Sequence, residues 1–217
     1  MKALPSPGAS VDLVIESDAG ALQAILSMPR DAAPRGVVVV CHPHPLYGGS
    51  MQNKVVTTLA QSAGEAGCAA LRFNFRGVGD SEGIHDGGKG EVDDVLAALA
   101  EAAEWLPGQP LLLAGFSFGG AMAVRAAERH AVAQLTTIAP ALNYWGGERV
   151  TGPACPWLLI HGDADDVVDC DDTLRRAREA QQPPDIHVLP GVGHFFHGQL
   201  KPLRDLVTPA LVAAIEN

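Results

Sequence analysis

The sequence predicts an α/β fold with a mostly parallel sheet, and two observations support this prediction. Short apolar runs, rich in β-branched residues, alternate along the chain with longer segments of helical periodicity. Some of the short runs, such as GVVVVC at 36–41, are apolar at every position, which is typical of strands covered on both faces. Strands that alternate with helices usually form parallel sheets with helices on both sides, so we expect this layered arrangement.

Eight strands are expected in chain order. They span residues 11–15, 21–28, 36–41, 68–75, 110–116, 134–139, 157–162 and 186–190. The first two flank the turn-forming sequence SDAG at 17–20 and are expected to form a hairpin. Helices are expected over about 50–66, 92–106, 120–130, 171–181 and 203–216. Ser50 is expected to cap the first helix, and Gly67 to end it.

Length and composition indicate one globular domain over residues 1–217. The chain is 47% hydrophobic and 18% charged, which suits a protein with a buried core. Its net charge is −10 and it has no basic run, so neither nucleic acid nor a membrane is an expected partner. No segment has the pattern of a signal-peptide core or a membrane span. The four cysteines form no CxxC pair, so a reduced, cytoplasmic protein is expected.

A candidate nucleophile lies in the sequence GFSFG at 115–119. This sequence falls between the expected strand 110–116 and the expected helix 120–130, which is the context of a G-x-S-x-G nucleophile elbow. Its serine, Ser117, would occupy a tight turn in which larger residues at the glycine positions would clash. The N-terminus of the following helix would favour negative charge developing nearby.

A serine nucleophile needs a base, and the base needs a carboxylate that orients it. Acidic residues occur in the sequence HGDADDVV at 161–168, after the seventh strand, and His194 follows the eighth. Both loops are expected at the carboxyl edge of the sheet, beside Ser117. His197 is an alternative base, but the position directly after Gly193 favours His194. The candidate carboxylates are Asp163, Asp165 and Asp166.

Four segments together resemble the α/β-hydrolase superfamily, over essentially the whole chain. They are FRGVGDSEG at 75–83, GFSFGG at 115–120, HGDADDVV at 161–168 and GVGHFF at 191–196. In the family's G-x-x-D pattern the acid lies three residues after a glycine, which here selects Asp165. Some relatives place the acid after the sixth strand, but that loop has no carboxylate before Glu148. The resemblance implies that Ser117 is the nucleophile, His194 the general base and then acid, and Asp165 the residue that orients His194.

Two backbone N–H groups are the expected donors to a tetrahedral oxyanion. One belongs to Phe118, the residue after the nucleophile. The other is expected in the loop CHPHPLYGG at 41–49, after the third strand, where members of the family often have His-Gly. Because Pro43 has no N–H to donate, the N–H of His44 is the expected second donor.

The same loop allows a different interpretation, in which His42 and His44 are ligands of a metal hydrolase. A catalytic zinc site needs three or four ligands and an open position, and no HExxH or HxHxDH run is present. A near match to a phosphate-binding loop, GIHDGGKG at 83–90, lacks the final serine or threonine and is expected to be an ordinary loop. We therefore expect neither a metal nor another cofactor.

The chain resembles the small, lidless, dienelactone-hydrolase-like members of the superfamily, although those use cysteine as the nucleophile. Only residues 140–156 separate the sixth and seventh strands, which is too short for a lid. Tyr47, Trp145 and Phe195 are expected to contact the substrate. The resemblance implies hydrolysis of small, short-chain carboxylic esters through an acyl-enzyme on Ser117.

Other activities remain open for the same residues. A thioesterase, an acyltransferase or a peptidase would use the same triad, and some members of the fold have lost the triad and act as binding proteins. The presence of Ser117, Asp165 and His194 argues against a binding protein. The sequence does not indicate the leaving group, the preferred acyl-chain length or the oligomeric state.

Overall fold

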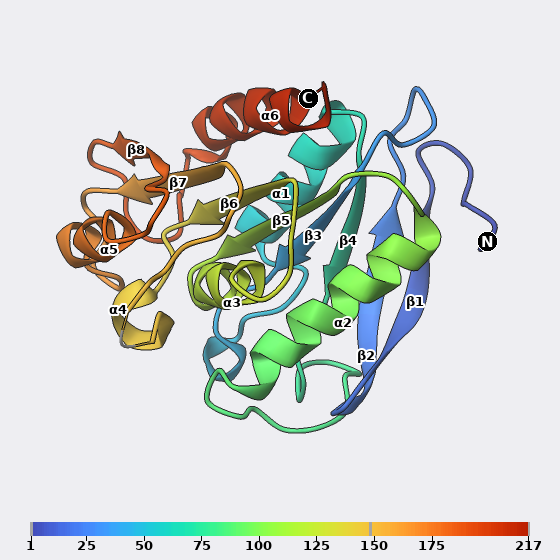
Figure 1. Cartoon of the computed structure of the whole chain (residues 1–217), viewed down its shortest axis with the longest axis horizontal. Coiled ribbons are helices and arrows are strands. Elements are labelled where there is room, and N and C mark those ends of the chain that lie inside the picture. The colour runs from blue at the N-terminus through green and yellow to red at the C-terminus, as the bar shows by residue number, and fades with distance from the viewer. Residues whose placement is uncertain (1, 148, 217) are drawn as a thin grey trace.

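One eight-stranded sheet forms the centre of the protein, as the sequence predicts (Figure 1). The computed structural model describes residues 2–147 and 149–216. Its strands are β1 (Ser10–Ser17), β2 (Gly20–Ser27), β3 (Val37–Cys41), β4 (Ala69–Phe73), β5 (Leu111–Phe116), β6 (Gln134–Ile138), β7 (Trp157–Gly162) and β8 (Asp185–Leu189). Their order across the sheet is β1-β2-β4-β3-β5-β6-β7-β8.

The sheet is parallel except at its hairpin edge. β1 pairs antiparallel with β2, and β2 pairs antiparallel with β4. From β4 to β8 all neighbouring strands are parallel. Every residue of β3, β6 and β7 is buried, because helices cover both faces of these central strands. Since parallel strands end at one edge, the loops after β3, β5, β7 and β8 lie together there.

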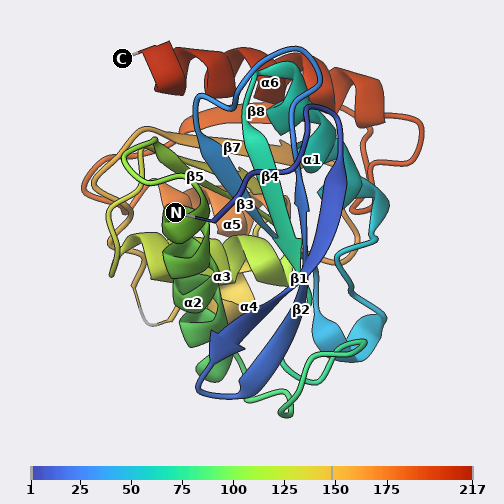
Figure 2. The same cartoon turned by 90° about the vertical axis from the view of Figure 1, so that its right-hand side faces the viewer.

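The helices form a layer on each face of the sheet (Figure 2). They are α1 (Lys54–Glu65), α2 (Gly90–Trp105), α3 (Phe118–Ala127), α4 (Leu142–Trp145), α5 (Cys170–Ala177) and α6 (Leu200–Glu216), with a short 3₁₀ helix, η1 (Pro45–Tyr47). α1 and α6 pack together and share one core with the sheet. α2, α3 and α5 contribute to the core on the opposite face. The short helices η1 and α4 lie in the loops after β3 and β6 and were not predicted.

The first helix begins later than the sequence predicts. Its capping residue is Asn53 and not Ser50, because the Asn53 side chain accepts a hydrogen bond from the N–H of Val55 at 2.8 Å. Ser50 instead accepts a longer bond, of 3.3 Å, from the N–H of Gln52 in the preceding turn. Asparagine and serine are equally favourable at the N-cap, so residue type does not distinguish the two positions. Gly67 follows the helix with a φ of 81°, as expected of a terminating glycine.

The loop after β4 joins the hairpin to the rest of the molecule. The guanidinium of Arg76 contacts the carboxylate of Asp94 on α2 at 2.7 Å and that of Asp18 in the hairpin turn at 2.8 Å. The hydroxyl of Ser81 donates to the carbonyl oxygen of Asn74 at 2.7 Å. Asp94 is fully buried, so loss of the Arg76 side chain would leave its carboxylate without the opposite charge of the guanidinium. This segment, part of the family resemblance, therefore has a structural role.

No lid covers the carboxyl edge of the sheet in the described part of the chain. Between β6 and β7 the described residues form only the short helix α4 (Figure 1). Glu148, the first carboxylate in this segment, lies outside the described residues. No helix among the described residues is long and apolar enough to cross a membrane.

Candidate active site

Ser117 lies in the sharp turn between β5 and α3. Its φ of 55° and ψ of −118° are rarely adopted by residues with a side chain, so the backbone is strained at this position. A Cβ on Gly115 would lie 2.3 Å from the carbonyl oxygen of Gly119, and a Cβ on Gly119 would lie 2.3 Å from that of His42. Only glycine fits at these two positions, as expected of a nucleophile elbow.

A continuous chain of hydrogen bonds joins the side chains of Ser117, His194 and Asp165. Ser117 Oγ lies 3.0 Å from His194 Nε2, and His194 Nδ1 lies 2.7 Å from Asp165 Oδ2. The side chains of His194 and Asp165 are almost fully buried, and Ser117 is 7% exposed. Because an ionised carboxylate only accepts hydrogen bonds, Nδ1 of His194 carries a proton and Nε2 is free to accept one from Ser117. The structure thus brings together the three residues expected to act in catalysis.

The carboxylate of Asp165 is held at both oxygens. Oδ1 accepts hydrogen bonds from the N–H groups of Val167 and Val168 at 2.9 and 2.8 Å. Oδ2 receives the bond from His194 and lies 3.2 Å from Nε2 of His161. Burial raises the pKa of Asp165, but the contacts with His161, His194 and the Val168 amide outweigh burial and hold the pKa below its usual range. The carboxylate therefore stays ionised at neutral pH.

The alternative acids, Asp163 and Asp166, and the alternative base, His197, take no part in these hydrogen bonds. Asp163 accepts a hydrogen bond from the N–H of Gly191 at 2.6 Å, so it joins the acid loop to the histidine loop. Asp166 is exposed. The ring of His197 stacks on that of Phe195, with 5.8 Å between centroids. The distances therefore favour Asp165 as the acid and His194 as the base.

The two expected oxyanion donors border the same cleft as Ser117. Phe118 is the first residue of α3, so its N–H has no partner within the helix. His44 is the N-cap of η1, with a φ of −53°. Within the described residues, neither N–H donates a hydrogen bond to another protein atom. The structure therefore places both expected donors at the cleft, and their role toward an oxyanion stays a prediction.

His42, one of the two histidines of the metal interpretation, connects neighbouring loops. Its Nδ1 hydrogen bonds with the carbonyl oxygen of Pro43 at 2.6 Å, and its Nε2 accepts from the N–H of Phe75 at 3.0 Å. Burial lowers the pKa of His42 to about 4, so the ring is neutral at pH 7. Both ring nitrogens are engaged by the backbone. In the described ranges, no three His, Cys, Asp or Glu side chains are grouped closely enough to hold a metal ion.

A cleft with a volume of about 380 Å³ opens beside Ser117. Most of its lining is aromatic or aliphatic, namely Tyr47, Phe118, Tyr144, Trp145, Val167 and Val168. Tyr47 and Trp145 were expected from the sequence. Tyr144 and the two valines were missed, although the valines directly follow the acidic residues of HGDADDVV. Their position beside the acid is a signal that sequence analysis could have used.

Phe195 was expected to contact the substrate, but it does not line this cleft. The residue is 52% exposed and its ring contacts that of His194, with 5.2 Å between centroids. The next residue, Phe196, has a φ of 52° and is buried in the core near Phe116. Because Phe196 takes the inward position, Phe195 is turned toward solvent beside His194, and its expected contact with the substrate stays a prediction.

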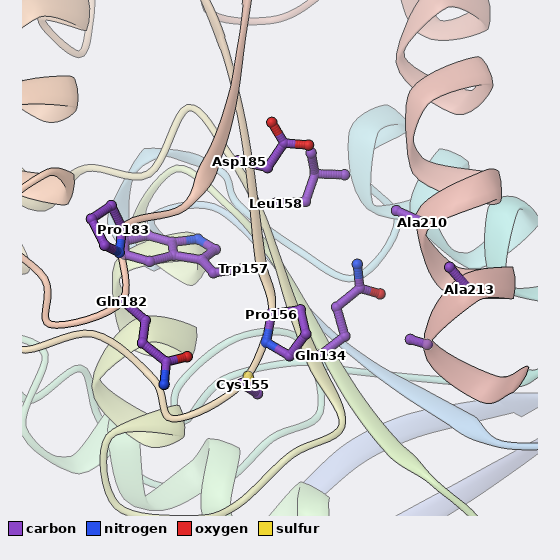
Figure 3. Close-up of a pocket in the computed structure, with 11 residues that line it drawn as sticks. Gln134, Cys155, Pro156, Trp157, Leu158, Gln182, Pro183, Asp185, Ala210 and Ala213 are labelled. Atoms are coloured by element: carbon purple, nitrogen blue, oxygen red, sulfur yellow. The ribbon is translucent and has the colours of Figure 1, made fainter. Parts of the chain in front are cut away.

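A second cleft, of equal volume, lies at the opposite edge of the sheet (Figure 3). It is formed where β6, β7 and β8 begin, at Gln134, Trp157 and Asp185, and α6 borders it with Ala210. Ser117 and its partners do not line this cleft. Ser117 and the cleft that it borders are therefore separate from this second cleft.

Comparisons with known proteins agree with this fold. A family model described as serine aminopeptidase, S33, matches residues 32–154. An α/β serine hydrolase homologue from Coxiella burnetii is 39% identical, with a TM-score of 0.89 over 96% of this chain and 100% of that one. A serine hydrolase without a lid from Xanthomonas campestris is 37% identical, with a TM-score of 0.89 over 97% and 96%. Est1E from Butyrivibrio proteoclasticus, solved with ferulic acid bound, shares the fold at 20% identity, with a TM-score of 0.83 over 94% and 100%.

The sheet, the nucleophile elbow and these matches define a serine hydrolase of the α/β class. The chain belongs to the α/β-hydrolase superfamily, among its small members without a lid. The family predicted from four short segments of sequence is thereby confirmed. Membership alone does not decide which bond the protein cleaves.

Proposed function

We propose that the protein hydrolyses small carboxylic esters through an acyl-enzyme on Ser117. The observation that most supports this proposal is the chain of hydrogen bonds from Ser117 through His194 to Asp165. Ser117, the first residue of this chain, borders a mainly apolar cleft. The N–H groups of His44 and Phe118 adjoin the same cleft, where a tetrahedral oxyanion would form.

The reaction has two halves that use the same groups. Ser117 Oγ attacks the carbonyl carbon while His194 Nε2 takes its proton, and the N–H groups of His44 and Phe118 stabilise the oxyanion. His194 then gives the proton to the departing alcohol, which leaves the acyl group on Ser117. The same nitrogen then takes a proton from a water molecule, whose oxygen attacks the acyl carbon. The bond to Ser117 Oγ breaks, the acid is released, and Nε2 returns the proton to Oγ. Throughout, Asp165 stays ionised and stabilises the charged imidazole.

The cleft is expected to hold the acyl group of the ester. His194, which must protonate the leaving group, does not line the cleft, whereas both oxyanion donors do. The leaving group therefore faces His194, and the acyl group points into the cleft. A volume of about 380 Å³ is near the lower end for small-molecule sites. This size favours a short acyl group.

The lining of the cleft also favours esters over the substrates of an aminopeptidase. An aminopeptidase must bind a free, protonated α-amino group. Among the described residues that line the cleft there is no carboxylate, so such an amine would lose its hydration without gaining an opposite charge. A neutral acyl ester carries no such penalty.

A substrate panel tests this proposal. We expect kcat/KM to be highest for p-nitrophenyl esters with short acyl chains, and lower for longer chains, matched thioesters and aminoacyl p-nitroanilides. A p-nitroanilide as the best substrate would indicate a peptidase, and a thioester would indicate a thioesterase. If no substrate were cleaved and a fluorophosphonate did not label the protein, a binding protein would be indicated instead.

Removal of one oxyanion donor is expected to lower kcat by about 10²–10³-fold. The change His44→Pro deletes the N–H. Because the φ of −53° at this position is close to that of proline, proline can adopt the same φ. His44→Ala loses the same imidazole but keeps the N–H, and is expected to retain much of the activity. Steady-state kinetics and Tm are measured for both. Equal losses would show that the N–H of His44 is not a donor.

A further inference from the structure

His161 contacts the proposed catalytic acid without belonging to the triad. It lies near the end of β7, and its side chain is fully buried. Its Nε2 lies 3.2 Å from Asp165 Oδ2 and hydrogen bonds with the carbonyl oxygen of Val168 at 3.2 Å. Its Nδ1 is buried and has no hydrogen-bond partner among the described residues. A fully buried polar side chain with one unpaired nitrogen calls for a physical explanation.

The contacts of His161 assign its proton to one nitrogen. The carboxylate of Asp165 and the carbonyl of Val168 both accept hydrogen bonds, so Nε2 must be the nitrogen that donates. A proton on Nδ1 would be buried without an acceptor, which is unfavourable. The neutral ring with its proton on Nε2 satisfies every contact around it. His161 is therefore a fixed donor directed at the acid and its loop.

The loop held by His161 also forms part of the active site. Val168, whose carbonyl oxygen binds His161, donates its own N–H to Asp165 Oδ1 at 2.8 Å. Val168 also lines the cleft beside Ser117. His161 thus acts on the carboxylate directly at Oδ2 and indirectly at Oδ1, through Val168.

We propose that His161 is a positioning residue, whose Nε2–H keeps Oδ2 of Asp165 directed at Nδ1 of His194. This inference rests on the proposed ester hydrolysis. When Ser117 gives its proton to His194, the charged imidazole is stabilised only if the carboxylate is already in place. Without His161 the carboxylate and its loop would occupy several orientations, and fewer molecules would have His194 aligned with Ser117. His161 itself exchanges no proton with the substrate.

Two substitutions separate the hydrogen bond from the bulk of the ring. His161→Leu removes the N–H and keeps a similar volume, whereas His161→Gln places an amide N–H at about the position of Nε2. We expect the leucine variant to lose about 10- to 100-fold in kcat, with a smaller change in KM, because the 3.2 Å contact of Nε2–H with the charged carboxylate and the bond to the Val168 carbonyl are both lost. The glutamine variant is expected to recover most of this loss. The assay uses p-nitrophenyl acetate, and Tm shows whether each variant folds.

Proton NMR provides a readout that needs no substrate. The proton on Nδ1 of His194, which is shared with Asp165 at 2.7 Å, is expected to give a downfield resonance. The resonance should persist in the wild type and in His161→Gln, and should broaden or shift in His161→Leu. A purely structural role for His161 would lower Tm in both variants and leave this resonance unchanged in the folded fraction.

His187→Leu is the matched control. Nε2 of His187 also lies 3.2 Å from a carboxylate, that of Asp185, but this pair is on β8 and partly exposed. The control should leave kcat and the resonance unchanged. Wild-type kcat and an unchanged resonance in folded His161→Leu would overturn the proposal, and so would a glutamine variant as impaired as the leucine variant. If the wild type hydrolysed no ester, the proposed function would fail, while the resonance would still decide the role of His161.

Discussion

Alanine in place of Ser117 is expected to lower the turnover of p-nitrophenyl acetate by about 10⁶-fold, the loss typical of removing a triad nucleophile. Without Oγ, which lies 3.0 Å from Nε2 of His194, the histidine has no hydroxyl to deprotonate and no acyl-enzyme forms. The cleft and both oxyanion N–H groups remain, so any residual rate reflects these alone. The measurement is the steady-state release of p-nitrophenol by the wild type and the variant.

Ser62→Ala is the matched control for this experiment. Ser62 lies on α1, is fully buried, and its hydroxyl has no hydrogen-bond partner in the described part of the chain. Its loss therefore removes a buried serine hydroxyl away from the active site, and turnover should equal that of the wild type. Near-normal turnover by Ser117→Ala would contradict the assignment of the nucleophile.

Asparagine in place of Asp165 is expected to lower kcat by about 10⁴-fold. Oδ1 of Asp165 accepts hydrogen bonds from two N–H groups, at 2.9 and 2.8 Å, so the asparagine carbonyl oxygen would take that position. Its amide NH₂ would then face Nδ1 of His194, which would have to give up its proton and become an acceptor. The proton would move to Nε2, the nitrogen that must accept from Ser117. The kcat of Asp165→Asn, measured on p-nitrophenyl acetate, tests this effect.

The control for this substitution is Asp166→Asn. Asp166 neighbours the proposed acid in sequence but is exposed, so the same change of charge there should leave kcat close to that of the wild type. Asp166 was also an alternative acid in the sequence. A larger loss in Asp166→Asn than in Asp165→Asn would reverse the assignment.

Most of the fold could be predicted because the central strands are unusually uniform. β3 and β7 are buried at every position; β3 is apolar throughout and β7 begins with the apolar run WLLI, a pattern that no amphipathic helix would show. The place of β2 beside β4 was not predicted, since it depends on contacts between distant residues. One of these is the bond of 2.7 Å from the amide of Asn74 to that of Gln23. The N-cap at Asn53 was missed for a similar reason, because two equally suitable residues lie in one turn.

The candidate site was predictable where a residue follows the end of a strand at a characteristic spacing. Ser117, Asp165 and His194 all do so, and the structure brings them together, although their catalytic roles remain predictions. His161 gives no such signal, since from its sequence it is only the penultimate residue of a buried strand. Its contact with Asp165 arises from the turn after β7. The outward side chain of Phe195 likewise depends on Phe196 being buried, which residue type does not reveal.

The central claim, that Ser117 is the nucleophile of an ester hydrolase, is tested most directly by mapping the residue that a fluorophosphonate modifies. The wild type is incubated with the probe, digested and analysed by mass spectrometry, and ester turnover is followed in the same sample. We expect one adduct, on Ser117, that forms as turnover is lost and is absent from Ser117→Ala. An adduct on another residue, or full loss of turnover with Ser117 unmodified, would contradict the account.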